Sequence, residues 1–225
     1  MSSKEKTMIL QVLISLITII IAIVSHEVAH GWMAYCLGDD TPKKQNRLSL
    51  NPKHHIDLFG SIILPALMFF SKSGVVFGWA KPVVINYNNL RNKKRDYILV
   101  ASAGVIANLL LAAISALSLK ISLIIPSNIL SGILAMFFLN MIFFNILLAV
   151  FNLIPIPPLD GSKILLGWFD NDYIKKYLNS ERIGTLTLIF ILFIIPVITK
   201  LVGISYNPIL SFLQKTTKTI VSLLI

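Results

Sequence analysis

Residues 8–24 form an apolar run without a single charged side chain, and it leads directly into residues 25–31, Ser-His-Glu-Val-Ala-His-Gly. A run of this length and composition is typical of a helix that crosses a membrane. An ionisable residue inside such a helix costs about 2.5–3.5 kcal/mol on insertion scales, and residues of this kind usually mark functional sites. The stretch therefore predicts a membrane helix that carries a polar functional site near its far end.

The composition of the whole chain agrees with a membrane protein. Of its 225 residues, 56% are hydrophobic and only 13% are charged, whereas a soluble domain carries about 25% charged residues. The net charge is +10, but the basic residues lie between apolar segments instead of along one helix face. That arrangement favours anchoring beside an anionic lipid bilayer and argues against a nucleic-acid partner.

The order of apolar segments predicts one polytopic membrane domain over residues 1–225, an all-α integral membrane bundle with about 4–6 transmembrane helices. The full spans are expected over residues 8–37, 97–119, 128–153 and 183–202. Residues 208–225 could form a last span or an interfacial helix. We expect the core of the domain, which carries the functional site, over about residues 8–170 and accessory helices over residues 183–225.

Two stretches do not read as ordinary spans. Residues 58–70 are apolar but short and are interrupted by Gly60 and Pro65, which favours a re-entrant segment. Residues 75–85 are rich in β-branched and aromatic residues with glycine breaks, which predicts a short β-hairpin.

The basic residues also predict an orientation. The loops at residues 38–57, 81–96 and 155–182 hold thirteen lysines and arginines together, whereas residues 121–127 hold none. By the positive-inside rule the basic loops are cytoplasmic, which leaves the N-terminus outside, although Lys4 and Lys6 weigh against this. We therefore expect a multi-pass protein of the cell membrane with its site toward the cytoplasm. No small-x-small cleavage site follows the first run, so we interpret it as a retained helix and not a signal peptide.

The histidines in this first helix have metal-ligand spacing. His26 and His30 are four residues apart, so they project from one helix face and can share one Zn²⁺ per chain. Glu27 is then close enough to accept a proton from an attacking water. Alternatively, these side chains could merely hydrogen-bond to one another within the bundle.

A catalytic zinc usually has three protein ligands, so a third ligand is needed. Asp160 is the best candidate because it follows a proline-interrupted segment at the end of an apolar span, where unwound backbone can line a polar cavity. A plain turn is an equally good interpretation of Asp160, since Asp-Gly pairs favour turns in general.

Two stretches together carry a family resemblance. Residues 26–31 and residues 152–161, Asn-Leu-Ile-Pro-Ile-Pro-Pro-Leu-Asp-Gly, resemble the paired signature of the site-2 protease family of intramembrane zinc metalloproteases. Residues 47–57 and 77–83 are similar to the compact prokaryotic branch of that family, which has neither a PDZ nor a CBS domain. The resemblance covers about residues 20–165.

The resemblance implies roles for particular residues. It implies that His26, His30 and Asp160 bind zinc and that Glu27 is the general base. The reaction implied is regulated intramembrane proteolysis, the hydrolysis of peptide bonds in or near transmembrane segments of membrane-protein substrates. A zinc metalloendopeptidase of the HExxH type is therefore the expected enzyme class.

Three further residues are weaker candidates for the substrate-binding or oxyanion site. Asn108 resembles the asparagine of the family's Gly-Pro-x-x-Asn element, with Val105 in place of the usual proline. It could polarise the scissile carbonyl or only bond two helices together. Asn152 could orient the turn before Asp160. His55 could cap the site or bind a substrate terminus, and it could also be a solvated loop histidine. Two other asparagines on the third span, Asn140 and Asn145, are predicted to form interhelical hydrogen bonds.

Alternative functions stay open at this point. A non-hydrolytic membrane metal-binding protein or transporter is the main one, but transport favours further acidic or histidine residues along the spans, and residues 97–119 and 128–153 contain none. A pseudoprotease that binds transmembrane segments without cutting them is disfavoured because Glu27 is present. Residues 75–85 could hold an extended substrate by β-augmentation or only pack against the bundle.

Overall fold

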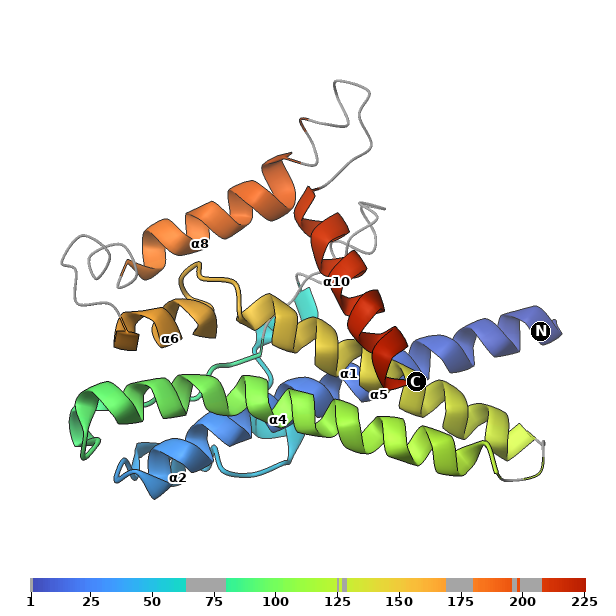
Figure 1. Ribbon diagram of the computed structural model, residues 1–225, viewed down its shortest axis with the longest axis horizontal. Coiled ribbons are helices and arrows are strands. Elements are labelled where there is room, and N and C mark those ends of the chain that lie inside the picture. The colour runs from blue at the N-terminus through green and yellow to red at the C-terminus, as the bar shows by residue number, and fades with distance from the viewer. Residues whose placement is uncertain are drawn as a thin grey trace.

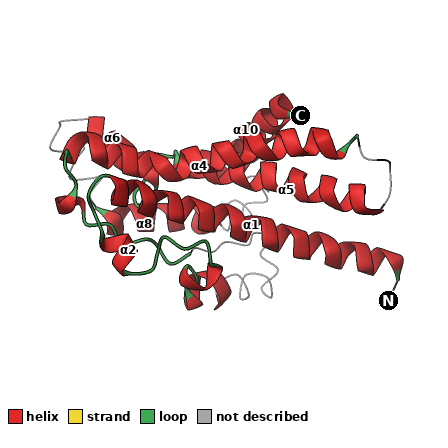
Figure 2. Cartoon of the chain, turned by 90° about the horizontal axis from the view of Figure 1, so that it is seen from below, coloured by secondary structure: helices red, strands yellow, loops and turns green. Residues whose placement is uncertain are grey.

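The computed structural model describes residues 2–63, 80–124, 126, 129–168, 180–195, 198 and 208–225, and these residues are mostly helical. Three long helices form the body of the protein: α1 (Ser3–Cys36), α4 (Lys93–Ser122) and α5 (Ile129–Asn152). Each packs against the other two, with α4 antiparallel to α1 and α5 (Figure 1 and Figure 2). All three are long and apolar enough to cross a membrane, so a helix is present at each of the first three predicted spans.

The ends of α1 and α4 have recognisable sequence signals. Ser2 caps α1 in a capping box with Glu5, so the helix begins five residues before the predicted start. The helix ends before Gly38, whose φ of 114° lies in a region that favours glycine. The Asn92 side chain accepts a hydrogen bond from the Arg95 N–H and caps α4. These caps fix where the helix bundle meets its polar loops.

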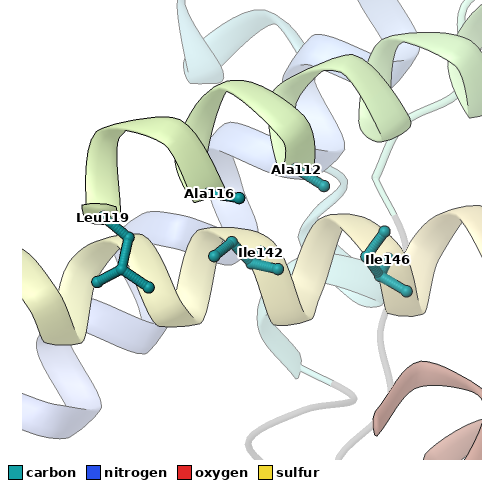
Figure 3. Close-up of a cluster of buried hydrophobic side chains, with 5 residues drawn as sticks. All are labelled: Ala112, Ala116, Leu119, Ile142 and Ile146. Atoms are coloured by element: carbon teal, nitrogen blue, oxygen red, sulfur yellow. The ribbon is translucent and has the colours of Figure 1, made fainter. Parts of the chain in front are cut away.

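Small residues bring α4 and α5 close together. Ala112, Ala116 and Leu119 of α4 meet Ile142 and Ile146 of α5 in a fully buried cluster (Figure 3). Alanine leaves room for backbone-to-backbone approach, which membrane helices use because lipid provides little hydrophobic drive for association. Side chains near the C-terminal end of α10 (Pro208–Leu224) pack against the same cluster. The predicted tail helix therefore exists and lies on α5.

The remaining described elements are short. They are α2 (Thr41–Lys44), the 3₁₀ turns η1 (Pro52–His54) and η3 (Tyr87–Asn89), the π-helical turn η2 (Leu58–Ile63), α6 (Asp160–Trp168), α8 (Glu181–Ile189) and its π-helical continuation η4 (Phe190–Ile194). The α2 helix, α6 and the start of α4 lie at the end of the bundle opposite the N-terminus (Figure 1). Polar loops therefore gather at one end of the long helices.

The predicted β-hairpin is not found among the described residues. Residues 80–86 form neither helix nor strand, and no strand occurs in the described part of the chain; residues 75–79 lie outside it. Instead of joining a neighbouring strand, the backbone N–H groups of Lys81, Val83 and Asn86 bond to three separate parts of the chain. These residues satisfy their donors individually, without a sheet.

The other irregular predictions are described only in part. Of the expected re-entrant segment, residues 58–63 form η2, and residues 64–70 lie outside the described residues. Of the expected fourth span, residues 183–195 are helical, and the following residues up to 202 lie outside them apart from residue 198. A re-entrant loop and a fourth span stay predictions.

Candidate metal centre

The histidine pair lies on a buried face of α1. His26 and His30 are 6% and 7% exposed, on the side of α1 that packs against α4. Their ring centroids are 4.6 Å apart and nearly perpendicular, as expected for neighbours one helical turn apart. The helix therefore directs both imidazoles into the interior of the bundle.

Asp160 reaches the histidines from the far side of the sequence. It is the first residue of α6 and is 5% exposed. A Cβ atom at Gly161 would collide with the Leu153 carbonyl, so only glycine allows the chain to fold back this tightly after α5. The proline-rich turn thus places the Asp160 carboxylate beside a helix that lies 130 residues away in sequence.

The three side chains converge on one point. Asp160 Oδ2 lies 3.1 Å from His26 Nε2 and 3.1 Å from His30 Nε2, and the two Nε2 atoms are 3.0 Å apart. Ligand atoms on a tetrahedral zinc are separated by roughly 3.3 Å, given Zn–N distances of about 2.0–2.1 Å. The three residues are therefore close enough to bind one metal ion.

Hydrogen bonds behind the imidazoles orient them for metal binding. His30 Nδ1 lies 2.7 Å from the Val100 carbonyl oxygen, and His26 Nδ1 lies 2.7 Å from Asn108 Oδ1. Both partners are acceptors here, because the Asn108 amide nitrogen already donates to the Ala22 carbonyl oxygen and to Asn145. The two Nδ1 atoms must then carry protons, and in the neutral rings the two Nε2 atoms present lone pairs toward Asp160.

This donor set fits a cation. Two imidazole lone pairs and a carboxylate oxygen about 3 Å apart repel one another unless positive charge lies among them. A buried centre of two neutral histidines and one aspartate, with N–H groups bonded outward, is the arrangement in which proteins hold zinc. Three protein ligands also leave one coordination position for a substrate or water.

Gly104 of α4 makes the convergence possible. A Cβ atom at this position would lie 2.5 Å from both His26 Cε1 and His30 Nε2. Such contacts are far inside van der Waals range, and the imidazoles cannot rotate away without losing their Nδ1 hydrogen bonds. Absence of a side chain at Gly104 lets α4 lie directly against the histidine pair.

Glu27 is held on another side of the cluster. Its Oε2 atom accepts a hydrogen bond of 2.9 Å from the backbone N–H of Val83. Its side chain is half-buried, in contrast to the fully buried histidines. Glu27 is next to His26 in the chain, but its carboxylate is not among the three converging groups.

The weaker candidates lie in other places. Asn108 is fully buried behind His26, where both of its amide donors are engaged. Asn152 donates to the Leu148 carbonyl oxygen within its own helix. His55 is only 2% exposed, and its Nε2 bonds to the Ser49 carbonyl oxygen, so it is not a solvated loop residue. Of these three residues, only Asn108 forms a hydrogen bond to a member of the metal cluster within the described part of the chain.

One comparison with known proteins decides the family. The chain is 36% identical over 183 residues to a Bacillus subtilis (strain 168) protein named "Putative zinc metalloprotease YwhC", and the match covers 80% of each chain. The chain belongs to the YwhC zinc metalloprotease family. No protein-family profile matches the chain, and no solved structure does.

For a zinc metalloprotease of the YwhC family, the cluster supplies what the enzyme class requires. It has three ligand residues close enough to bind a metal and a carboxylate, Glu27, next to the first ligand in the chain. Sequence reasoning missed three supporting groups: the carbonyl oxygen of Val100, the N–H of Val83, and Gly104. Only Gly104 left a signal in the sequence, because it lies in residues 103–108, Ala-Gly-Val-Ile-Ala-Asn, the stretch around Asn108 that resembles the Gly-Pro-x-x-Asn element.

Proposed function

We propose that the chain is an intramembrane zinc protease of the site-2 protease type, which hydrolyses peptide bonds in or near transmembrane segments of membrane proteins. The observation that carries the proposal is the convergence of His26, His30 and Asp160 among helices long and apolar enough to cross a membrane. A protease that acted only on soluble peptides would have no need to place its metal ligands on such helices.

Each residue of the cluster has a role in this reaction. His26, His30 and Asp160 would hold one zinc ion, whose Lewis acidity lowers the pKa of a water molecule and polarises the scissile carbonyl. Glu27 accepts a proton from the water as the water oxygen bonds to the carbonyl carbon. When the C–N bond breaks, Glu27 passes the proton to the leaving amine. Asn108 holds the His26 imidazole from behind.

The substrate in this proposal is a transmembrane segment that has unwound near the site, because an intact helix hides its backbone carbonyls from attack. Residues 80–85, next to Glu27, could hold the unwound segment by backbone hydrogen bonds in the manner of β-augmentation. The basic loops at this end of the bundle support a cytoplasmic position for it by the positive-inside rule. The enzyme is then a multi-pass protein of the cell membrane.

A metal transporter is the competing function, and the spans argue against it. The second and third predicted spans, residues 97–119 and 128–153, contain no histidine or acidic residue to pass an ion along. The ligands form one cluster at one depth. A single fixed cluster suits catalysis better than passage.

The Glu27→Gln variant tests the proposal. We expect the purified wild-type chain in detergent to bind about one zinc and to cut a reporter transmembrane substrate, with cleavage abolished by a chelator. Glu27→Gln should keep its zinc and lose at least about 100-fold in cleavage rate, because the base is gone and the three ligands remain. Mapping the product by mass should place the cut within or beside the membrane segment. A wild-type chain that binds zinc without cutting any such substrate would contradict the proposal.

A further inference from the structure

The irregular segment at residues 80–86, here called the anchored segment, approaches the site through its backbone. The N–H of Val83 donates to Glu27 Oε2 at 2.9 Å. An N–H bond to an ionised carboxylate is charge-assisted, and about twice as strong as a bond between neutral groups. The segment therefore holds one oxygen of the carboxylate that follows His26 in the chain.

Two other parts of the chain fix the anchored segment on either side of Val83. Lys81 N–H donates to the His55 carbonyl oxygen at 2.8 Å, and Asn86 N–H donates to Asp39 Oδ2 at 2.8 Å. His55 and Asp39 are themselves buried, with 2% and 0% of their surfaces exposed. The segment is thus bonded at three points within six residues, and the middle point is Glu27.

Val83 packs closely against a face of α1 at the position of Gly31, which has no side chain. Gly31 lies four residues after Glu27 and so lies on the same face of the helix. A Cβ atom at Gly31 would lie 3.3 Å from Val83 Cγ1 and 3.0 Å from Leu48 Cδ2. A Cβ atom at Gly31 would therefore require the Val83 and Leu48 side chains to shift by a few tenths of an ångström, so glycine lets Val83 lie close to α1.

We propose that the anchored segment is a positioning element for the general base, and that the Val83 N–H is the group that aims Glu27. This inference rests on the proposed function. A glutamate side chain has several rotamers, and a base must lie within hydrogen-bond reach of the proton that it accepts. Holding Oε2 fixes the carboxylate and leaves Oε1 for the transfer. No metal ligand bonds to the anchored segment among the contacts described, so aiming the base is separate from binding zinc.

The sharpest test removes this one N–H. Replacement of Val83 by its α-hydroxy analogue converts the amide to an ester, which keeps the side chain and the chain path but deletes the donor. We expect kcat on the reporter substrate to fall about 10- to 100-fold, with KM changed less than about threefold and the zinc content unchanged. Val83→Pro deletes the same donor and should give the same split between kcat and KM.

Leu50→Pro is the control, because it puts a proline into the exposed part of a neighbouring loop. It should leave kcat and zinc content near the wild-type values. The proposal is overturned if the ester variant keeps the wild-type kcat, or if it loses zinc in proportion to activity, since the segment would then support the metal ligands. If Val83→Pro does not fold, the ester variant decides alone. A wild-type chain with zinc but no peptidase activity would instead refute the proposed function.

Discussion

The histidine side of the site (His26 and His30) and the glutamate side (Glu27) are held in place by different kinds of structure. His26 and His30 are oriented by α4, through an asparagine side chain and a helix carbonyl oxygen. Glu27 is met by the N–H of Val83, in a segment that is neither helix nor strand. One side depends on two long helices packed together, and the other depends on an irregular connection held by single hydrogen bonds.

This difference indicates that the two sides have separate functions: the histidine side holds the metal, and the glutamate side positions the base. A metal ion needs ligands that stay in place, and packed helices with fully buried groups behind the ligands provide that. A base needs a defined direction but must also tolerate a substrate arriving beside it. Irregular segments at sites carry that kind of role more often than helices do. Substitutions on the histidine side should therefore affect zinc binding, and substitutions on the glutamate side should affect turnover.

The largest expected effect on the histidine side comes from Gly104→Ala. The added Cβ would lie 2.5 Å from both imidazoles, so one of the histidines must leave its position. We expect the purified variant to lose most of its zinc and at least about 100-fold in cleavage rate. Metal analysis and the reporter assay measure both.

Gly132→Ala is the matched control for Gly104→Ala. Gly132 also lies on a long apolar helix, and a Cβ atom there meets nothing within 4 Å. It should keep wild-type zinc content and activity. Full zinc in Gly104→Ala would show that the histidine side adapts as easily as the glutamate side, and the proposed division would fail.

Much of the histidine side could be predicted from the sequence, because it depends on side-chain identities and on their spacing. Apolar length predicted α1, α4 and α5, and the i, i+4 spacing predicted that His26 and His30 share a face. The prediction that Asn140 and Asn145 bond between helices is also confirmed, by Ser15 and Asn108 respectively.

The glutamate side could not be predicted in the same way. The Val83 N–H is a backbone group, and every residue except proline has one, so sequence does not indicate which N–H reaches Glu27. The β-branched composition of residues 75–85 favoured a hairpin, but β-propensity depends strongly on tertiary context. In this protein, bonds to three separate loops and helices determined the path of the segment.

A smaller effect on the histidine side is expected from Asn108→Ala. The substitution leaves the His26 Nδ1 proton without its acceptor and leaves Asn145 without the donor from Asn108. Removing such an outer partner typically weakens metal affinity by about 10- to 100-fold. Competition with a chromophoric chelator measures the change in zinc affinity.

Asn140→Ala is the corresponding control, since it also deletes a half-buried interhelical hydrogen bond, the one that Asn140 Oδ1 accepts from the Ser15 hydroxyl. The hydrogen-bond partners of Asn140 are Ser15 and Met136 and not members of the metal cluster, so the zinc affinity of this variant should stay close to that of the wild type. Equal losses of zinc affinity in the two variants would mean that general helix packing, and not the bond to His26, holds the imidazole.

The smallest effect concerns the buffer pH and the far end of the anchored segment. Burial opposes the charged form of Asp39, but hydrogen bonds from Thr41, Asn89 and the Asn86 N–H outweigh it and hold the pKa of Asp39 below its usual value. A carboxyl group with a lowered pKa stabilises the fold at pH values above the unfolded-state pKa of about 3.9, and this stabilisation is lost as the pH falls through the lower folded-state value. Acid should therefore loosen the glutamate side through Asp39.

Asp39→Asn isolates this contribution, because it cannot titrate. Between pH 6 and pH 3 the thermal midpoint of the wild type should fall further than that of Asp39→Asn, by about 2–4 °C for each kcal/mol involved. Loss of zinc at low pH lowers both midpoints alike and cancels in the difference. Parallel pH curves would show that the ionised Asp39 carboxylate does not stabilise the end of the anchored segment, and the glutamate side would then depend on its other two bonds alone.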